Sequence, residues 1–505
     1  MINGNLYAHF QVMFHRFSDK IALTEVDGST LSYGQLDSAA GMMAAYLSEL
    51  GVQRGDRVSV QVAKSTQAMV LYLACLRGGY VFHPLNTGYK KNELSYFLSN
   101  AEPVLMVCDQ AGVAVLAPLC QQANVPTLMT LNADGSGSLT EHLGNINTQL
   151  PVAELEPDTL AALLYSSGTT GTPKGVMLSH ENLRSNAASL VRGWGFTPDD
   201  VLLHALPIFH VHGLFVALGC VFLSGASMRW LPGFDLDEVL KALPLTTSMM
   251  GVPTYYTRLL GSDRFNRQTA ANIRLFISGS APLLIETFED FEKRTGHRIL
   301  ERYGMTETNM NTSNPLNGER RGGTVGVPLP GVEVRIADDN DQPLAYGEIG
   351  SLQVRGDNVF KGYWKMPDKT AEDFTVDGYF NTGDKGQMSA DGYVAIVGRA
   401  KDMVISGGLN IYPKEIELVI DELPGVLESA VIGVAHEDFG EALVAVVVRS
   451  GEIEETEILI ALKTRISAFK VPKRVIFLEQ LPRNTMSKVQ KNLLREQFAD
   501  LLKLK

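Results

Sequence analysis

The stretch YSSGTTGTPKGV, residues 165–176, follows the apolar run Leu160–Leu164 and contains hydroxyls, glycines and one lysine close together. Backbone N–H groups, hydroxyls and a cation in one loop are what a polyphosphate needs. The Walker A loop has a glycine before its lysine and a hydroxyl after it. Here Pro173 precedes Lys174 and Gly175 follows it, so that pattern fails at two positions. A flexible Ser/Thr/Gly linker is the alternative, but an apolar run rarely leads into a linker with Pro-Lys-Gly. We therefore expect a phosphate-binding loop of another type.

Length and composition indicate an ordinary globular protein with several domains. The 505 residues suggest about three domain-sized units, and 45% hydrophobic with 20% charged residues is a typical balance. A net charge of −12 excludes a general nucleic-acid binder, which needs a basic face. Cysteines without a C-x-x-C pair or zinc-ligand spacing predict buried thiols in a reducing compartment. They are Cys75, Cys108, Cys120 and Cys220.

No segment predicts a membrane span or a signal peptide. The first twenty residues are interrupted by polar side chains and lack an apolar core. The most apolar long stretch, Val201–Met228, contains His204, Pro207, His210 and His212, so a buried strand–turn–helix is the better interpretation. We expect a cytoplasmic protein with no membrane partner.

Short apolar runs alternate with helical patterns in the N-terminal part. This alternation predicts parallel sheets covered by helices. The predicted strands are Val58–Val62, Val104–Cys108, Leu202–Leu206 and Leu275–Ser278, and the predicted helices are Gln67–Leu76 and Ala114–Gln122. Glycine-rich sequence from Gly322 to Val397 predicts a β-rich subdomain.

The pattern changes after about residue 400. We expect an α+β unit with helices at Pro413–Leu423 and Glu455–Phe469 and strands at Ser429–Val434, Ala442–Val448 and Val475–Leu478. The segment GRAKDMVISGG (398–408) is charged and flanked by glycines, which suits a hinge, although a plain surface turn fits as well. The predicted domains are therefore a large α/β N-terminal domain (1–398), a hinge (399–402) and a small, mobile C-terminal domain (403–505).

The segment ERYGMTET (301–308) combines an aromatic ring, a hydroxyl and a carboxylate. Tyr303 could stack on a base, Thr306 could bond a phosphate, and Glu307 could hold Mg²⁺, which prefers one or two carboxylates plus phosphate oxygens. An ordinary turn with a solvated glutamate is the alternative.

Three further segments carry candidate residues. Asp384 in FNTGDKG (380–386) could accept both hydroxyls of a ribose, although most such aspartates bond their own backbone. Arg399 in the presumed hinge could reach a ribose or phosphate, or be merely solvated. Lys488 in LPRNTMSKVQK (481–491) could stabilise developing negative charge, or be an ordinary surface lysine.

Taken in order, SSGTTGTPKG, YGMTE, TGD, GRxKD and PRNTxxK resemble the adenylate-forming superfamily of acyl-CoA synthetases, luciferases and adenylation domains. The resemblance spans essentially the whole chain. It implies that a carboxylate attacks the α-phosphorus of ATP to give an acyl-adenylate and pyrophosphate. In the ligase branch, the thiol of coenzyme A then displaces AMP. One departure is Ser487, where the family usually has glycine before the lysine.

The resemblance also implies a role for each motif residue. Thr306 would contact the α-phosphate, Glu307 would hold Mg²⁺, Lys401 would be the pivot, and Lys488 would be catalytic. His210 would be an acyl-pocket or gate residue, with a general base as the alternative role, and His212 would be structural. The nucleotide-binding residues would be Ser166, Ser167, Gly168, Thr169, Thr170, Gly171 and Lys174 at the phosphates, Gly279, Ser280, Ala281 and Tyr303 at adenine, and Asp384 and Arg399 at the ribose.

Four segments are similar to those of malonyl-CoA synthetases: 204–214, 250–260, 276–284 and 302–315. Arg258, in an otherwise apolar helical stretch, would meet the second carboxylate of malonate or a related dicarboxylate, assisted by Ser278. An arginine on the wet face of its helix is the alternative. Three alternative functions are a ligase for another short, medium-chain or aryl acid, an adenylation domain that loads a carrier protein, and a non-catalytic nucleotide-binding protein. We expect ATP, Mg²⁺ and coenzyme A as cofactors, and a monomer or homodimer.

Overall fold

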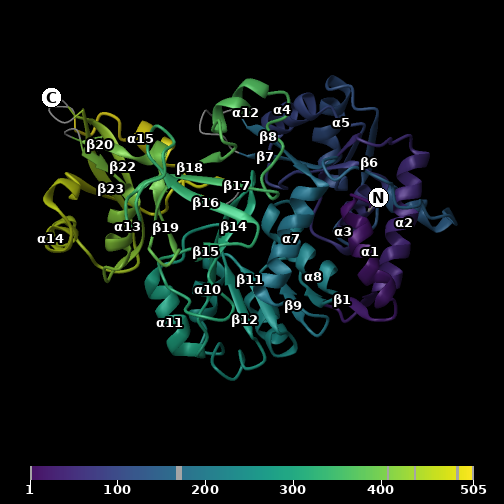
Figure 1. Cartoon of the computed structure of the whole chain (residues 1–505), viewed down its shortest axis with the longest axis horizontal. Helices are drawn as coiled ribbons and strands as arrows, with labels where there is room; N and C mark the ends of the chain where they lie inside the picture. Colours follow the sequence, from purple (N-terminus) through teal and green to yellow (C-terminus); the bar gives the residue numbers. More distant parts are fainter. Residues whose placement is uncertain (1–2, 167–172, 407–408, 437–439, 485–487, 503–505) are drawn as a thin grey trace. The chain divides into compact units, whose positions relative to one another are not determined.

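The computed structural model describes residues 3–166, 173–406, 409–436, 440–484 and 488–502. The chain forms two compact units. The larger contains Met1–Val334 and Val354–Phe380, and the smaller contains Arg335–Gln353 and Asn381–Lys505. Figure 1 shows helices alternating with strands through the larger unit. The predicted fold class, α/β with a small C-terminal α+β part, is confirmed.

One sheet of the larger unit is mostly parallel and ends in an antiparallel hairpin. Its strand order is β6-β5-β3-β4-β7-β8. Only β8 runs antiparallel to its neighbour, β7. The helices α3, α4 and α5 supply the crossovers that parallel strands require. The bounds are β3 (Arg57–Gln61), α3 (Thr66–Gly78), β4 (Val81–Pro84), α4 (Lys91–Ala101), β5 (Leu105–Cys108), α5 (Val113–Gln122), β6 (Thr127–Thr130), α6 (Ser138–Glu141), β7 (Leu160–Ser166) and β8 (Lys174–Ser179).

The second sheet has the order β15-β14-β13-β12-β11-β9-β10-β1-β2. The six central strands, β13, β12, β11, β9, β10 and β1, are parallel. Strand β2 at one edge and strands β14 and β15 at the other are antiparallel additions. The strands are β1 (Ile21–Glu25), β2 (Thr30–Ser32), β9 (Val201–His204), β10 (Ser227–Trp230), β11 (Ser248–Gly251), β12 (Leu275–Ser278), β13 (Leu300–Met305), β14 (Asn309–Ser313) and β15 (Val327–Pro328). The helices are α1 (Leu6–Arg16), α2 (Tyr33–Glu49), α7 (His180–Trp194), the π-helix η3 (His212–Ala217), α8 (Leu218–Ser224), α9 (Leu236–Ala242), α10 (Pro253–Leu260), α11 (Ile285–Thr295) and α12 (Pro367–Asp373).

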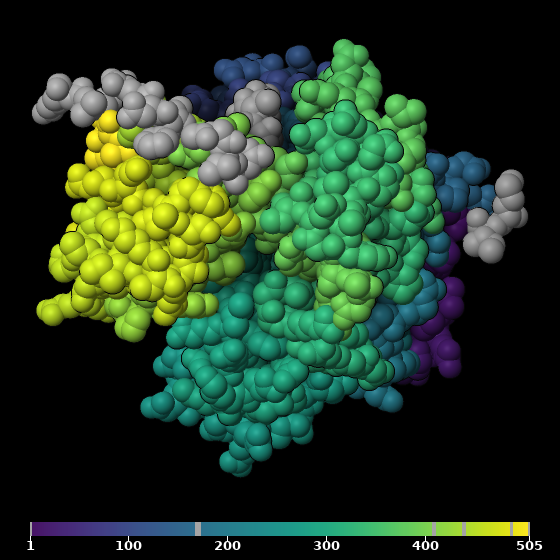
Figure 2. All heavy atoms as spheres, turned by 60° about the vertical axis from the view of Figure 1, so that its left-hand side comes forward, coloured from purple at the N-terminus to yellow at the C-terminus, as the bar shows by residue number. Residues whose placement is uncertain are grey.

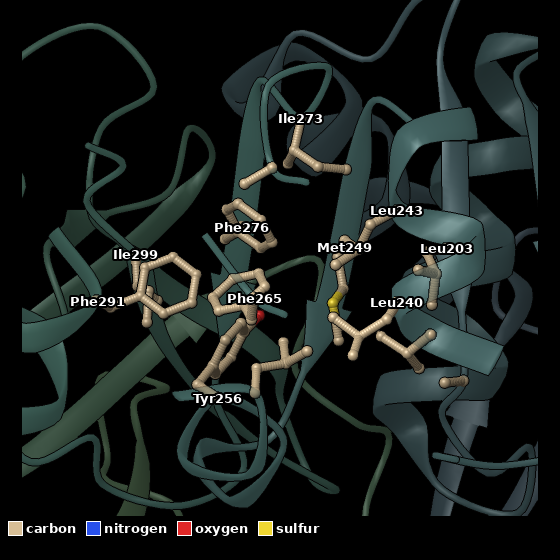
Figure 3. Close-up of a cluster of buried hydrophobic side chains, with 14 of the residues drawn as sticks. Leu203, Leu240, Leu243, Met249, Tyr256, Phe265, Ile273, Phe276, Phe291 and Ile299 are labelled. Carbon is tan, nitrogen blue, oxygen red and sulfur yellow. The ribbon is translucent and has the colours of Figure 1, made fainter. Parts of the chain in front are cut away.

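Aromatic side chains pack between the second sheet and the helices α10 and α11 (Figure 3). The ring of Phe276 on β12 lies 4.9 Å from that of Phe291, and the Tyr256 ring lies 5.4 Å from the same residue, both edge to face. The Tyr256 hydroxyl donates a hydrogen bond of 2.5 Å to the carbonyl of Ile277. This packing fixes α10 against the end of β12, beside Ser278.

The smaller unit contains two sheets. One has the order β16-β17-β18-β19, and the other β21-β20-β23-β22, with β24 beside β23. Alternate residues of β22 and β23 enter two separate cores, because side chains alternate across a strand. Figure 2 shows the last part of the chain, in yellow, as one compact group of atoms. The bounds are β16 (Val332–Ala337), β17 (Gly350–Gly356), β18 (Phe380–Met388), β19 (Val394–Arg399), η5 (Ala400–Asp402), β20 (Val404–Ser406), β21 (Leu409–Ile411), α13 (Pro413–Asp421), β22 (Val426–His436), β23 (Gly440–Arg449), α14 (Glu455–Arg465), β24 (Arg474–Leu478) and α15 (Lys491–Gln497).

All the predicted strands and helices are confirmed, with bounds that shift by a few residues. The apolar stretch 201–228 is indeed strand, turn and helix. The four cysteines are buried free thiols. No helix among the described residues is long and apolar enough to cross a membrane.

The division of the chain differs from the predicted boundary at 398/399. Residues 335–353 and 381–398 belong to the smaller unit, and the division falls within strands β16, β17 and β18. A change in sequence pattern does not reveal this, because a boundary at 398/399 cuts through β19, whose last residue, Arg399, pairs with Asp384 on β18. That residues 399–402 act as a hinge stays a prediction.

We expect the stability of the larger unit to depend on pH through His180. Its Nδ1 accepts the N–H of Leu6 at 3.1 Å, and burial lowers its pKa from 6.5 to about 3. Below pH 6.5 the unfolded chain therefore binds a proton that the folded chain does not. Stability then falls by up to about 1.4 kcal/mol per pH unit until the folded pKa is reached. In His180→Asn, whose side-chain oxygen can replace Nδ1 as acceptor, this contribution should disappear.

The measurement is urea unfolding at about pH 7.5 and about pH 5, followed by tryptophan fluorescence. The three tryptophans, Trp194, Trp230 and Trp364, all lie in the larger unit. The exposed His142→Asn is the matched control. Equal pH slopes for the native protein and His180→Asn would contradict the assignment.

Candidate active site

The stretch 165–176 spans an antiparallel hairpin. Strand β7 ends at Ser166, β8 begins at Lys174, and these two residues are direct cross-strand partners. The other predicted phosphate ligands, Ser167, Gly168, Thr169, Thr170 and Gly171, lie outside the described residues. A hydroxyl and a cation therefore face each other at the base of the predicted phosphate loop.

Glu307, the predicted magnesium ligand, lies in the turn between β13 and β14. Its side chain is 5% exposed and accepts a hydrogen bond of 2.8 Å from the Ser166 hydroxyl. The Tyr363 hydroxyl is a second hydrogen-bonding neighbour. Both of these partners are neutral, and among the described residues no lysine, arginine or histidine forms an ion pair with this buried carboxylate. A cation from outside the protein would balance its charge.

A magnesium ion fits this carboxylate better than a metal with several protein ligands. Among the described residues, no group of three or more His, Cys, Asp or Glu side chains could hold a metal. Magnesium is commonly bound by one or two carboxylates together with water and phosphate oxygens. Glu307, beside the base of the phosphate loop, supplies one such carboxylate.

Lys174 is held by two residues that the sequence analysis did not identify. Its Nζ lies 3.4 Å from Oδ2 of Asp373 and 4.1 Å from the ring centroid of Tyr363. Lys369 contacts the other Asp373 oxygen at 2.9 Å. Burial, and then the carboxylates of Glu307 and Asp373, raise the pKa of Tyr363, so its hydroxyl stays protonated. No sequence motif includes Tyr363 or Asp373, because the pattern of residues 363–373 is typical of a solvent-exposed helix.

Parallel strands place Ser278, a predicted substrate-binding residue, at one edge of the second sheet together with the ends of its neighbours. His204, Gly251 and Ser278 end β9, β11 and β12. In register, Met250 lies beside His204, Gly251 beside Ser278, and Ser278 beside Glu301. Ligands of parallel sheets bind beyond these carboxyl ends.

The predicted adenine loop, residues 279–281, continues from β12. Ser280 is exposed and has φ of +70°, a conformation that costs energy for a residue other than glycine and is frequent at active sites. Its hydroxyl lies 3.3 Å from Nδ1 of His212, at the start of η3. Ala281 is exposed, whereas Tyr303 is half-buried on β13, and Thr306 is half-buried in the turn that carries Glu307.

The sequence analysis missed Arg302 on β13. This side chain is 2% exposed, and within the described residues its Nε and Nη2 are buried without a hydrogen-bond partner. A Cβ at position 279 would overlap the guanidinium, so Gly279 lies directly against it. Burial lowers the pKa of Arg302 to about 9, so it remains a cation at neutral pH. The buried Ser278 hydroxyl likewise has no partner in the described structure. A buried cation and a hydroxyl in this state suit an anion.

The structure shows the alternative interpretation of Arg258, an arginine on the solvent-exposed face of its helix. Its side chain is exposed on α10, with Cζ 5.8 Å from the ring centroid of Phe234. The buried arginine of this region is Arg302. It lies between Glu301 and Tyr303 in the segment ERYGMTET, and this position could have identified it as a candidate site residue. The substrate role of Arg258 stays a prediction. His210 is half-buried, and its carbonyl accepts the N–H of Leu214 in η3.

In the smaller unit, Asp384 on β18 pairs with Arg399 on β19. The two residues are cross-strand partners, and Arg399 Nε lies 3.1 Å from Oδ1 of Asp384, which is 4% exposed. This juxtaposition suits the predicted contact with a ribose. Lys401, the predicted pivot, is exposed in η5.

Lys488 is exposed on a closed loop. Its N–H donates to the side-chain oxygen of Asn484, and the Asn484 N–H donates to the Lys488 carbonyl. The next helix, α15, is tied to α13 by Lys491–Glu417 at 2.5 Å and to η5 by Arg495–Asp402 at 3.0 Å. The structure thus groups the residues of each unit, Asp384 with Arg399 in one and Ser166, Lys174 and Glu307 in the other.

Family models describe most of the sequence. The model of the AMP-binding enzymes matches residues 10–364, and the model of the AMP-binding enzyme C-terminal domain matches residues 415–488. The chain belongs to the AMP-binding enzymes.

Relatives of this AMP-binding enzyme are similar over nearly its whole length. The crystal structure of ATP-bound MatB from Rhodopseudomonas palustris is 51% identical, covers 99% of this chain and 100% of that chain, and has a TM-score of 0.96. Malonate–CoA ligase of Arabidopsis thaliana is 33% identical over 98% of this chain and 89% of the relative. Sulfoacetate–CoA ligase of Cupriavidus necator is 34% identical over 96% of both. The AMP-binding enzyme thus shares the fold of acid–CoA ligases.

We expect Glu307→Gln to abolish the effect of magnesium on ATP binding. The amide keeps the shape of the side chain but loses the charge that a cation needs. The apparent affinity for ATP in the presence of Mg²⁺ should fall by at least about 10-fold, whereas the affinity in its absence should hardly change. Calorimetric titration of ATP with and without Mg²⁺ measures both. Glu301→Gln, an equally buried glutamate on β13 that accepts the Leu283 N–H, is the control, and an equal loss there would contradict the assignment.

Proposed function

We propose that this AMP-binding enzyme is a malonate–CoA ligase. Malonate would attack the α-phosphorus of ATP to give malonyl-AMP and pyrophosphate. The thiol of coenzyme A would then attack the acyl carbon, forming malonyl-CoA and releasing AMP. The relatives that act on malonate support this substrate, and the buried guanidinium of Arg302 is the observation that carries it.

The chemistry of malonate matches the site around Arg302. Malonate has two carboxylates, so one can react with ATP while the other remains ionised. Arg302 and the Ser278 hydroxyl offer N–H and O–H donors that lack a partner within the described residues. A planar guanidinium can bind a carboxylate through two parallel hydrogen bonds. Acetate and fatty acids have no second charge and would leave the Nε and Nη2 donors of Arg302 without an anion to bind.

The other predicted residues would serve the nucleotide. Lys174 and the loop 166–171 would hold the β- and γ-phosphates, and Thr306 the α-phosphate. Magnesium, bound at Glu307, would neutralise phosphate charge. Asp384 and Arg399 would bind the ribose, and the adenine would lie against the 279–281 loop and Tyr303.

Lys488 would act on the reacting groups themselves. A carboxylate and a triphosphate repel each other, and a cation between them relieves this repulsion most in the transition state. Two hydrogen bonds join the backbone of Lys488 to Asn484. Lys401 would be the pivot that brings Lys488 to the substrates for adenylation and removes it for thioester formation.

Sulfoacetate is the second candidate, because the sulfoacetate–CoA ligase is similar over nearly the whole chain. Sulfoacetate also carries a second anionic group. Its sulfonate is tetrahedral, whereas a carboxylate is planar and matches two guanidinium N–H groups more closely. The two acids can be compared directly as substrates.

We expect malonate to be used with a kcat/KM about 10⁴-fold higher than acetate or octanoate, because a site with a buried charged donor rejects analogues that lack its partner. ATP–pyrophosphate exchange and consumption of the coenzyme A thiol would be measured for malonate, methylmalonate, sulfoacetate, acetate and octanoate. Formation of AMP, and not ADP, is required. Octanoate turned over as well as malonate would refute the substrate assignment.

Arg302→Gln should reduce kcat/KM for malonate by about 10²–10³-fold, because a buried charge partner of the substrate is lost. The KM for ATP should change little. Arg258→Gln removes an arginine of the same region whose side chain is exposed. It should cost about 10-fold or less, because solvent screens an exposed charge. A larger loss in Arg258→Gln than in Arg302→Gln would transfer the main role to Arg258.

A further inference from the structure

Lys64 follows strand β3 and lies beside the end of strand β9 in the other sheet. Its Nζ is 2.9 Å from Nδ1 of His204 and 2.7 Å from the His204 carbonyl oxygen. The same nitrogen lies 4.0 Å from the ring centroid of Trp230, at the end of β10. Two acceptors of one histidine and an aromatic face thus surround this amine, and burial lowers the pKa of Lys64 well below its ordinary value. No motif includes Lys64, and the nucleotide chemistry does not use it.

The contacts of His204 define its tautomer. Its Nε2 lies 2.9 Å from the carbonyl oxygen of Gly213, which can only accept, so Nε2 carries the hydrogen. Burial, and then the charge of Lys64, lower the pKa of His204 well below its ordinary value, so the ring is neutral. Nδ1 is therefore an acceptor, and Lys64 donates to it. Lys64 and Gly213 hold the two ring nitrogens from opposite sides.

Gly213 belongs to the π-helix η3, and π-helical turns are frequent at functional sites. A Cβ at this position would overlap the carbonyl oxygen of Pro207, so η3 lies directly against the segment that follows β9. The His210 carbonyl accepts the N–H of Leu214, which ties η3 to the same segment a second time. The ring of His204 thus contacts η3 through the hydrogen bond from its Nε2 to the Gly213 carbonyl oxygen.

The path from Lys64 ends at the acid site. His212, the first residue of η3, is 5% exposed, and its Nδ1 lies 3.3 Å from the Ser280 hydroxyl. Ser280 has a left-handed backbone and follows Gly279, which lies against Arg302. The charge of Arg302 also helps lower the pKa of His212, second to burial, so the two side chains are close and His212 is neutral. Each step is a direct contact between described residues.

We propose that Lys64 is a positioning residue for the acid-binding site, acting through His204 and η3 on His212 and the 278–281 loop. This inference rests on the proposed acid–CoA ligase function. Lys64 touches no reacting atom. It fixes the orientation of His204, which sets the place of the Gly213 carbonyl and with it the wall that faces the acid. Loss of Lys64 should therefore affect the acid more than ATP.

The test compares Lys64→Met with Lys20→Met. Methionine keeps an unbranched stem and removes the amine. Lys20 is the matched control, since it is partly buried in the same unit and donates to the carbonyls of Pro198 and Gly225. In Lys64→Met, kcat/KM for malonate should fall by about 10- to 10²-fold, as for other misplaced positioning groups, while the Kd of ATP measured without acid stays within two-fold. Lys20→Met should keep both values.

Equal losses in the two variants, an unchanged kcat/KM in Lys64→Met, or a parallel rise of the Kd of ATP would each overturn the proposal. If the native enzyme prefers another acid in the substrate screen, that acid replaces malonate, so failure of the malonate assignment is separate from failure of this inference. If Lys64→Met does not fold, a measurement on the native enzyme still tests the proposal. Imidazole ¹⁵N spectra, assigned with His204→Asn, must show His204 neutral with hydrogen on Nε2. Hydrogen on Nδ1 would refute the path.

Discussion

The backbone register of β9, β11, β12 and β13 is the constraint on which the proposed acid site depends. Parallel hydrogen bonding aligns the ends of these strands, so residues from four distant segments meet without needing any attraction among their side chains. The aromatic core behind β12 holds this edge in place. A cation as costly to bury as Arg302 can be kept there because the sheet, and not the charge, determines its position.

Sequence reasoning performed well where a local pattern carries the information. Apolar alternation located the strands and helices, and short motifs located Ser166, Lys174 and Glu307, which the structure brings to one place. Within the larger unit, it failed where burial decides. The helix carrying Arg258 has apolar residues on one side only, and a sequence pattern does not show that this arginine lies on the other side.

Contacts between distant residues were also invisible in the sequence. Tyr363 and Asp373 reach Lys174 from a segment about two hundred positions away, and no spacing rule links them. Lys64 meets His204 from the other sheet in the same way. Such partners acquire their meaning from the packing of complete elements, because their residue types are common in solvated positions.

The pairing of Asp384 with Arg399 has a practical consequence for recombining enzymes of this family. If two parent sequences were joined at residue 398, close to where the sequence pattern changes, the two members of this ion pair would come from different parents. The junction would also cut through β19, so that residues 394–398 stay native and Arg399 comes from the other parent. Crossovers just before residue 335 and on either side of the 354–380 segment would transfer the smaller unit whole, and chimeras built this way should inherit an intact Asp384–Arg399 ion pair.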